Sequence, residues 1–163
     1  MVLFFTSDTH FGDHRTLNIH KRPFASVAEM DEAMVAGWNA VVGPQDEVWH
    51  LGDFARKLSD VPKLLSLLSG RKHLLLGNND HPEIGDVPGW ASVRDYHEME
   101  EGGCRLILCH YPFRSWNGQA RRAINLHGHS HGKLKPMPRQ FDVGVDARGF
   151  RPVSLSQLLD PIG

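Results

Sequence analysis

Short apolar runs alternate along the chain with segments in which apolar residues recur at helical spacing. The run at residues 2–5 has no polar member, which predicts a strand buried on both faces. Apolar residues at helical intervals follow the capping-box pattern Ser26-Val27-Ala28-Glu29 and stop before Gly43, which predicts a helix between these points. The same reasoning predicts further strands at residues 47–51, 72–76, 123–126 and 141–145, and a strand that contains residues 106–108 and ends at His110. It also predicts further helices at 59–69 and after Ser154.

The order of these elements favours a layered α/β domain, because strands and helices alternate. A chain of 163 residues supports one domain, over residues 1–163. Residues 79–103 are the least regular part, and we expect a surface loop there with a weak strand near Val93.

Composition and charge exclude several classes of protein. The chain has 18 Lys and Arg against 19 Asp and Glu, so no overall basic field holds nucleic acid nonspecifically. No apolar run reaches the roughly 18–20 residues that span a bilayer, so we expect a cytoplasmic protein without a membrane partner. Cys104 and Cys109 lie on one predicted strand at an odd spacing, which argues against a disulfide. The 11 histidines suggest metal or acid–base chemistry.

Polar side chains follow five of the predicted strands at the point where each strand ends. In open α/β sheets, ligands bind in the crevice beyond the carboxyl ends of the strands. We therefore expect these side chains to converge on one site, although they are scattered in the sequence. The seven residues concerned are Asp8, His10, Asp53, Asn78, His110, His129 and His131.

The sequence fragments around these residues differ in specificity. Asp8-Thr9-His10 is weak by itself, because Asp95-Tyr96-His97 has the same pattern without a strand before it. Gly52-Asp53 is weaker still. Gly77-Asn78-Asn79-Asp80 and Gly128-His129-Ser130-His131 are specific, because such fragments are expected well under once in a random chain of this composition. Their occurrence in order, each after an apolar run, indicates a shared function.

Together the fragments resemble the signature of the calcineurin-like metallophosphoesterase superfamily: D-x-H, G-D, G-N-[H/D], a single His, and G-H-x-H. The match runs from Asp8 to His131. The resemblance implies a four-layer αββα sandwich, in which helices flank two mixed β-sheets. It also implies two divalent metal ions, one held by Asp8, His10, Asp53 and His131, the other by Asp53, Asn78, His110 and His129.

The chemistry of the residues agrees with such a centre. Two cations about 3.5–4 Å apart repel each other, and a bridging carboxylate such as Asp53 offsets this repulsion. Neutral imidazole and amide ligands add no charge, so the site stays attractive to a phosphate anion. A set of nitrogen and oxygen ligands without thiolate suits Mn²⁺, Zn²⁺, Fe, Co²⁺ or Ni²⁺, of which we favour Mn²⁺.

We therefore predict a metal-dependent phosphoesterase, in which a hydroxide that bridges the two ions attacks phosphorus. Many relatives carry a His after the Asn of G-N-[H/D], placed to protonate the leaving oxygen. Here Asn79 stands at that position, and its amide cannot transfer a proton, so we favour phosphodiesters with acidic leaving groups. His81 and His14 are candidate proton donors, and Arg114 is a candidate substrate contact.

Substrate and partner are less defined by the sequence. A nucleotide or a nucleic-acid end is a candidate substrate, because the basic segment with Arg114, Trp116, Arg121 and Arg122 could contact a phosphodiester backbone or stack a base. The oligomeric state stays open between monomer and homodimer.

Three alternatives to a phosphodiesterase remain. They are a phosphomonoesterase or nucleotide phosphatase of the same fold, a catalytically weak metal-binding interaction scaffold, and an amide or lactam hydrolase. The last is disfavoured because its early H-x-H-x-D pattern is absent. Of the other histidines, we interpret His50 as a core residue, His127 as structural or as support for a ligand, and His20 and His73 as surface residues.

Overall fold

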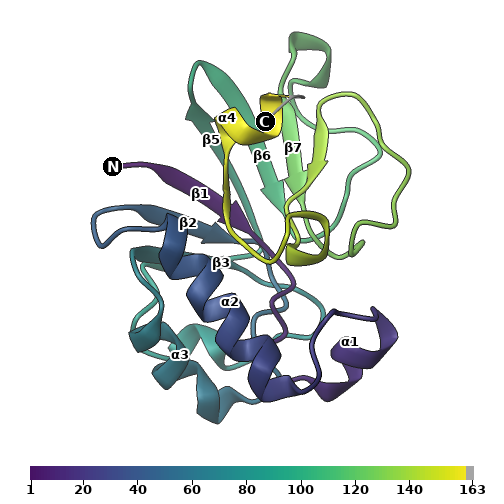
Figure 1. Ribbon diagram of the computed structural model, residues 1–163. Helices are drawn as coiled ribbons and strands as arrows, with labels where there is room; N and C mark the ends of the chain where they lie inside the picture. The colour runs from purple at the N-terminus through teal and green to yellow at the C-terminus, as the bar shows by residue number, and fades with distance from the viewer. Residues whose placement is uncertain (161–163) are drawn as a thin grey trace.

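The computed structural model describes residues 1–160 as two β-sheets that pack face to face (Figure 1). The first sheet has the strand order β4-β3-β2-β1-β9, and the second has the order β5-β6-β7-β8. The strands of the first sheet are β1 Leu3–Thr6, β2 Glu47–His50, β3 Arg71–Leu75, β4 Ser92–Arg94 and β9 Val153–Ser154. Those of the second are β5 Tyr96–Glu101, β6 Cys104–Cys109, β7 Ile124–His127 and β8 Gln140–Asp142.

Both sheets are mixed. Strand β9 pairs antiparallel with β1, and β5 pairs antiparallel with β6, whereas the remaining pairs are parallel. The predicted α/β class with two mixed sheets is confirmed. The predicted single domain 1–163 includes residues 161–163, which lie outside the described residues.

Two helices, α2 Val27–Val41 and α3 Val61–Leu67, cover the outer face of the first sheet (Figure 1). Helix α2 begins where the sequence predicts, because Ser26 Oγ accepts the Glu29 backbone N–H at 3.1 Å. The Glu29 carboxylate accepts the Ala25 N–H rather than that of Ser26, so the capping box is displaced by one residue. Met30 and Met34, on the face of α2 that packs against the core, are fully buried, and the burial of each side chain contributes roughly 1.5–3 kcal/mol to the stability of the fold.

Strand β1 is buried on both faces, as its apolar run predicts. Phe4 packs with the core under the helices, and Phe5 packs with the core between the two sheets. Successive side chains of a strand point to opposite faces, so one short apolar run serves two cores. This strand therefore anchors the residues that follow it from both sides.

The outer face of the second sheet is covered differently from that of the first. Within residues 1–160, Ile107, Trp116 and Ala123 form the small core on this face, under a loop with a 3-10 turn at Gln119–Arg121. The fourth layer is thus loop and 3-10 turn rather than α-helix. The short helix α4 Leu155–Leu159 begins with the predicted capping box of Ser154 and Gln157, and it packs against the core between the sheets.

Several elements differ from the sequence prediction. The predicted helix at 59–69 is a 3-10 turn at Leu58–Asp60 followed by α3. Helix α1 His14–Ile19, capped by the Asp13 side chain, was not predicted. Strand β5 was missed because four of its six residues are charged or His, whereas the weak strand near Val93 is present as β4.

Two further observations concern the whole of the described chain. Cys104 and Cys109 are free thiols, as their spacing predicts. No helix within residues 1–160 is long and apolar enough to cross a lipid bilayer.

Candidate metal centre

The structure brings all seven sequence-predicted ligand residues together at one edge, where loops leave the carboxyl ends of β1, β2, β3, β6 and β7. The first two loops continue the strand pairing beyond the sheet. The Asp8 N–H donates to the Gly52 carbonyl at 2.9 Å, and the His10 N–H donates to the Asp53 carbonyl at 3.0 Å. The backbone therefore fixes Asp8 and His10 against Asp53.

Asp53 lies between His10 and His110, candidate ligands of the two halves of the centre. Its Oδ2 lies 3.4 Å from His10 Nε2 and 3.5 Å from His110 Nε2. Asp8 Oδ1 lies 3.8 Å from Nε2 of both His10 and His131. One carboxylate oxygen of Asp53 thus faces both halves of the centre, which is the position of a bridging ligand.

The second half of the centre is completed by an amide. Asn78 Oδ1 lies 3.0 Å from His110 Nε2 and 3.1 Å from His129 Nδ1. The backbone N–H of His129 donates to Asp8 Oδ2 at 2.9 Å, which ties the loop after β7 to the loop after β1. Three acceptor atoms from three separate strands therefore point at one space.

Two of the imidazoles are anchored through their outer nitrogens. The Leu51 carbonyl lies 2.7 Å from His110 Nδ1, and Asp146 Oδ2 lies 2.7 Å from His131 Nδ1. Such acceptors require the proton on Nδ1, which leaves the Nε2 lone pair directed into the centre. Histidines that ligate metals are oriented in this way.

Asp146 and Arg22 support the centre and were missed by the sequence analysis. Arg22 donates to both Asp146 carboxylate oxygens at 2.9 Å, and to the backbone carbonyls of Asp8 at 2.6 Å and Thr9 at 2.9 Å. Burial by itself would raise the pKa of Asp146, but hydrogen bonds from His131 and Arg22 lower it to about 2. Asp146 is therefore a carboxylate at neutral pH, able to hold His131.

The electrostatics of the centre call for a cation. Burial raises the pKa of Asp8 well above its ordinary value, and the nearby Asp53 carboxylate raises it further. Burial lowers the pKa of His10 to about 4 and also lowers that of His110, so both imidazoles are neutral at pH 7. Asp8 Oδ1 and His10 Nε2 are buried without a hydrogen-bond partner, which costs roughly 1–3 kcal/mol for each group. A divalent cation between these acceptors would remove that cost, so the residues fit the metal centre that the resemblance implies.

Backbone strain is concentrated at the same place. Five candidate ligands have a positive φ, in the left-handed region that costs about 1–2 kcal/mol for a residue other than Gly. They are Asp8 (57°), His10 (48°), Asp53 (59°), His129 (67°) and His131 (48°). Strain of this kind persists where the surroundings over-determine it, which is common at functional sites.

The glycines of the two specific motifs allow this close approach. A Cβ at Gly128 would clash with Ser7 Oγ and would lie 2.5 Å from Asp8 Oδ2. A Cβ at Gly77 would clash with Asp53 Oδ1. A side chain at either position would therefore displace a candidate ligand.

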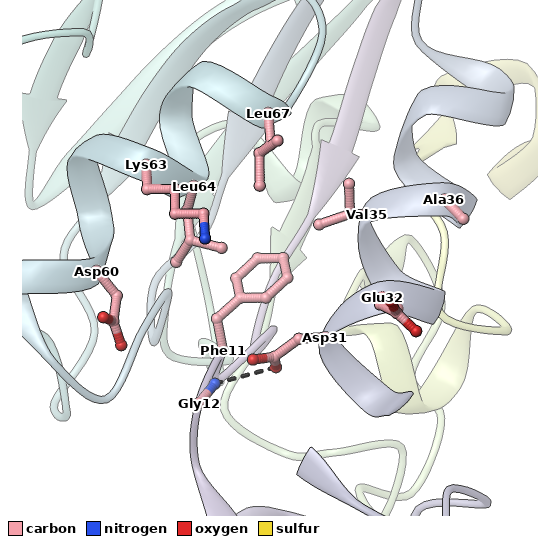
Figure 2. A pocket seen from close by; sticks show the side chains of 10 residues that line it. All are labelled: Phe11, Gly12, Asp31, Glu32, Val35, Ala36, Asp60, Lys63, Leu64 and Leu67. Carbon is pink, nitrogen blue, oxygen red and sulfur yellow. Dashed lines mark hydrogen bonds between the residues drawn. The ribbon is translucent and has the colours of Figure 1, made fainter. Parts of the chain in front are cut away.

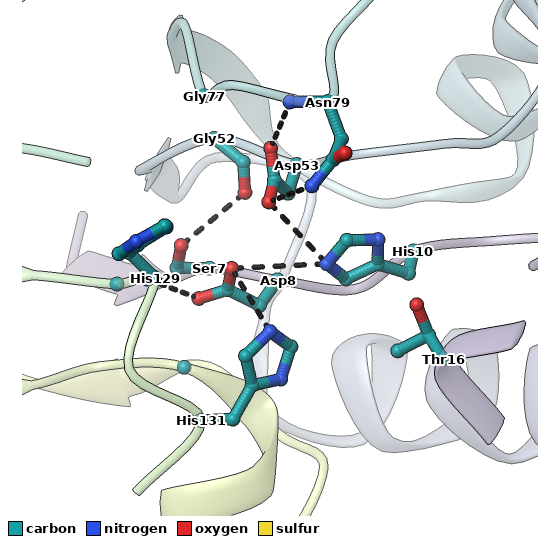
Figure 3. A network of polar contacts seen from close by, with 12 residues as sticks. Ser7, Asp8, His10, Thr16, Gly52, Asp53, Gly77, Asn79, His129 and His131 are labelled. Atoms are coloured by element: carbon teal, nitrogen blue, oxygen red, sulfur yellow. Dashed lines mark hydrogen bonds and ion pairs between the residues drawn. The ribbon is translucent and has the colours of Figure 1, made fainter. Parts of the chain in front are cut away.

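Asn79 and Asp80, in the loop that begins at Gly77, make different contacts with the loop after β2. Asp80 accepts the backbone N–H groups of Asp53, Phe54 and Gly77, each at 2.8 Å, so it joins the loops after β2 and β3. Asn79 donates its backbone N–H to Asp53 Oδ1 at 2.8 Å and its Nδ2 to Asp53 Oδ2 at 2.9 Å (Figure 3). Asn79 thus lies at the candidate metal centre and orients the Asp53 carboxylate.

The remaining candidate site residues lie at the surface. His14 is exposed and shares a hydrogen bond with Asn18, and His81 is exposed and accepts the Glu83 N–H. Arg114 is exposed on the loop that follows His110. The structure therefore places Asn79 at the Asp53 carboxylate and the other three on the surrounding surface.

Two interpretations of histidines as surface residues are wrong. His73 is buried, because its ring stacks on Trp49 with the centroids 4.2 Å apart. His20 is half-buried, because its ring stacks on His131 at 3.6 Å. His50 and His127 are buried, and His50 shares a hydrogen bond with Thr9, as expected for a core residue.

The basic segment after His110 is divided by the fold. Trp116 is buried and donates its indole N–H to the Ala123 carbonyl, so it cannot stack a base. Arg121 and Arg122 precede β7, at the opposite end of that strand from His129. Of this segment, only Arg114 follows the carboxyl end of a strand that carries a candidate ligand.

A cavity of about 460 Å³ lies away from the candidate ligands, between α2 and α3 (Figure 2). Phe11 forms its floor, and Val35 and Leu64 form its walls. Gly12 donates its N–H to Asp31 at 3.0 Å at one end. The cavity has no candidate ligand in its lining, so the chemistry belongs to the strand-end centre.

The structure has the two packed mixed sheets that the resemblance implies, and it brings the residues of the signature fragments together. No family model matches the chain. The gene 66 protein of Mycobacterium phage D29 is 32% identical over 178 residues, which cover 89% of this chain and 88% of that protein. An uncharacterised protein of Methanocaldococcus jannaschii is 29% identical over 167 residues, covering 96% and 89%. The chain belongs to the family of the phage D29 gene 66 protein.

Solved structures resemble the chain to different degrees, and one from Aquifex aeolicus shares its fold. A protein of unknown function from Aquifex aeolicus superposes with a TM-score of 0.78 at 23% identity, over 96% of this chain and 97% of that chain. The phosphoesterase YfcE from E. coli has a TM-score of 0.45 at 16% identity, over 88% and 78%. A novel archaeal phosphodiesterase has a TM-score of 0.46 at 19% identity, over 88% and 82%.

Proposed function

We propose that this protein is a phosphoesterase that uses two divalent metal ions and prefers phosphodiesters. The observation that carries the proposal is the Asp53 carboxylate, whose Oδ2 faces imidazole nitrogens of both halves of the centre. Asp8, His10, Asp53 and His131 would hold one ion, and Asp53, Asn78, His110 and His129 the other. Bound ions would act as Lewis acids on water and on the phosphoryl oxygens.

The charge of the centre favours an anionic substrate. Among the seven residues, only Asp8 and Asp53 bring negative charge, so two divalent ions leave the centre with a net positive charge. This charge attracts a phosphate ester and stabilises the charge that develops on its oxygens. The neutral imidazoles preserve this attraction.

The preference for diesters rests on Asn79. Asn79 donates one hydrogen bond to Asp53 through its backbone N–H and one through its side-chain amide, but an amide cannot give a proton to a leaving oxygen. His14 and His81, the other candidate donors, share hydrogen bonds with surface neighbours. A leaving group that needs no proton, such as an aryl oxide, should therefore depart best, and a diester brings less negative charge to the carboxylates than a monoester.

The test uses protein stripped of metal and reloaded with Mn²⁺. We expect two ions per chain and hydrolysis of bis(p-nitrophenyl) phosphate faster than of p-nitrophenyl phosphate. His110→Ala should abolish turnover, and Arg105→Ala, an exposed change at the other end of β6, should retain it.

Three results would contradict the proposal. Faster monoester hydrolysis would assign a phosphomonoesterase instead. Two tightly bound ions without turnover on either ester would assign a metal-binding scaffold. Equal activity with and without metal would remove the metal centre from the reaction.

A further inference from the structure

A pocket of about 260 Å³ lies between the loop that follows His110 and the loop that follows His131. Its apolar lining comes from Pro112 and Phe113 on the first loop and from Leu134 and Met137 on the second. Arg114 and Lys135 add one cationic side chain from each loop. The pocket therefore combines an apolar slot with positive charge, on two loops that each follow a candidate ligand.

Residues that adjoin the pocket lining in sequence contact the candidate ligands or a neighbour of one. The Tyr111 ring, which directly precedes the pocket residues, lies 5.1 Å from the His110 ring and 4.9 Å from the His129 ring. On the second loop, Lys133 Nζ lies 3.1 Å from His20 Nδ1, and His20 stacks on His131. The Tyr111 ring thus contacts two candidate ligands directly, and the Lys133 ammonium group is linked to a third through His20.

The surface around the pocket is unusually apolar for exposed loops. Tyr111 is 44% exposed and Leu134 is 46% exposed, on loops that follow two candidate ligands. Exposed apolar side chains gathered next to a reactive centre are typical of a ligand-binding surface. Their position favours contact with the substrate itself.

The back of the pocket is held rigidly. Gln140 donates its Nε2 to the Phe113 carbonyl at 2.6 Å and to Asn125 Oδ1 at 2.9 Å. The Phe113 N–H also donates to Asn125 Oδ1, at 3.2 Å. Because the first loop is already hydrogen-bonded to β7 and β8, a ligand would order few additional groups on binding, which favours affinity.

We propose that this pocket binds the nucleoside adjoining the scissile phosphate, which makes the substrate a single-stranded oligonucleotide. The base lies in the slot of Phe113, Leu134 and Met137, and the next phosphate along the strand contacts Arg114 and Lys135. The inference rests on the proposed phosphodiesterase function and specifies its substrate class.

Size and charge select this occupant. Pockets for drug-sized ligands run from about 300 to 1,000 Å³, so the present volume fits one ring system rather than a larger molecule. No carboxylate from the described residues lines the pocket, and its two cations match a phosphate. Aromatic side chains interleaved with basic ones are typical of surfaces that bind single strands. A base within a duplex is paired and stacked on both sides, so it cannot reach a pocket of this size unless it leaves the stack.

The experiment compares substrates that differ by one phosphate. Thymidine dinucleotides with and without a terminal phosphate at either end are hydrolysed by the Mn²⁺-loaded protein. We expect kcat/KM to be about tenfold to a hundredfold higher for at least one phosphate-bearing dinucleotide, because charge-assisted contacts are worth that factor. The combined variant Arg114→Ala and Lys135→Ala should remove this preference. The matched variant Arg105→Ala and Arg121→Ala, with two exposed arginines near the amino-terminal ends of β6 and β7, should keep it.

A binding measurement makes the test independent of turnover. In calorimetry, thymidine 3′,5′-bisphosphate should bind at least tenfold more tightly than thymidine 5′-monophosphate, and the Arg114 and Lys135 changes should abolish the difference. An equal response of the two double variants would overturn the proposal, as would equal affinity for the two nucleotides. Equal cleavage of single-stranded and duplex DNA would also overturn it. If the unchanged protein does not hydrolyse bis(p-nitrophenyl) phosphate, the proposed function itself is refuted.

Discussion

Replacing Asp146 by Asn would test the support of the metal centre. Asp146 Oδ2 lies 2.7 Å from His131 Nδ1, and both carboxylate oxygens accept from Arg22, whose side chain is fully buried. An Asn keeps one acceptor oxygen for the three N–H groups that Arg22 and His131 direct at Asp146, and its own amide N–H group faces a donor. His131 then loses its fixed orientation, and Arg22 loses its only carboxylate partner within residues 1–160.

The structure gives the size of both effects. The pKa of Asp146 is about 2 against an ordinary 3.8, and this difference corresponds to about 2 kcal/mol of stability at neutral pH. A buried charge left without its partner costs about 3–5 kcal/mol. We therefore expect the metal-free variant to lose roughly 2–5 kcal/mol of unfolding free energy. Loss of the hydrogen bond to a ligating His should weaken metal binding at the His131 position about 10–100-fold.

The sign of the pH dependence follows from the depressed pKa. The contribution of Asp146 is fully present above about pH 4, the ordinary range of a carboxyl, and it is lost as the pH falls towards 2. The difference in stability between the unchanged protein and the variant should therefore shrink over this acid range.

Urea unfolding of the metal-free proteins measures the stability, and calorimetric titration with Mn²⁺ measures affinity at each position. Asp86→Asn, a change of an exposed carboxylate, is the matched control. Unchanged Mn²⁺ affinity in a folded Asp146→Asn protein would refute the role of Asp146 in holding His131.

The remaining predictions concern four other residues. Asp53→Asn should abolish activity and lower metal content at both positions, because one carboxylate serves both; elemental analysis that still finds two tightly held ions would contradict the bridge. Burial lowers the pKa of His50 to about 3. Between pH 6.5 and about 3, this residue should therefore lower the unfolding free energy of the metal-free protein by about 1.4 kcal/mol for each unit that the pH falls. Urea unfolding at several pH values should show a smaller slope for His50→Gln, and an unchanged slope would contradict this role. His97→Ala should leave turnover within a few-fold, since this ring stacks on Trp49, and a collapse of turnover in folded protein would show that the ligand set is wrong. Asn79→His should raise hydrolysis of alkyl monoesters much more than of aryl diesters; equal rates for both ester types in the unchanged protein would mean that another residue supplies the proton.

The sequence determined which residues gather at the candidate centre. Asp8, Asp53, Asn78 and His110 each follow a strand that apolar patterning locates to within a few residues. Because the carboxyl ends of parallel strands meet at one edge, the meeting of these side chains could be predicted without coordinates. Helix α2 was equally predictable, since its cap and its apolar face are both local features.

The tertiary structure decided how those side chains are held and what surrounds them. Asp146 and Arg22 are 124 residues apart, and no local pattern marks either one. The Leu51 carbonyl that anchors His110 is a backbone group, which no residue type reveals. Strand β5 depends on pairing with β6, because its own residues are too polar to indicate a strand. The pocket between the loops after His110 and His131 arises because β6, β7 and β8 pair side by side in the second sheet, which no run of residues reveals.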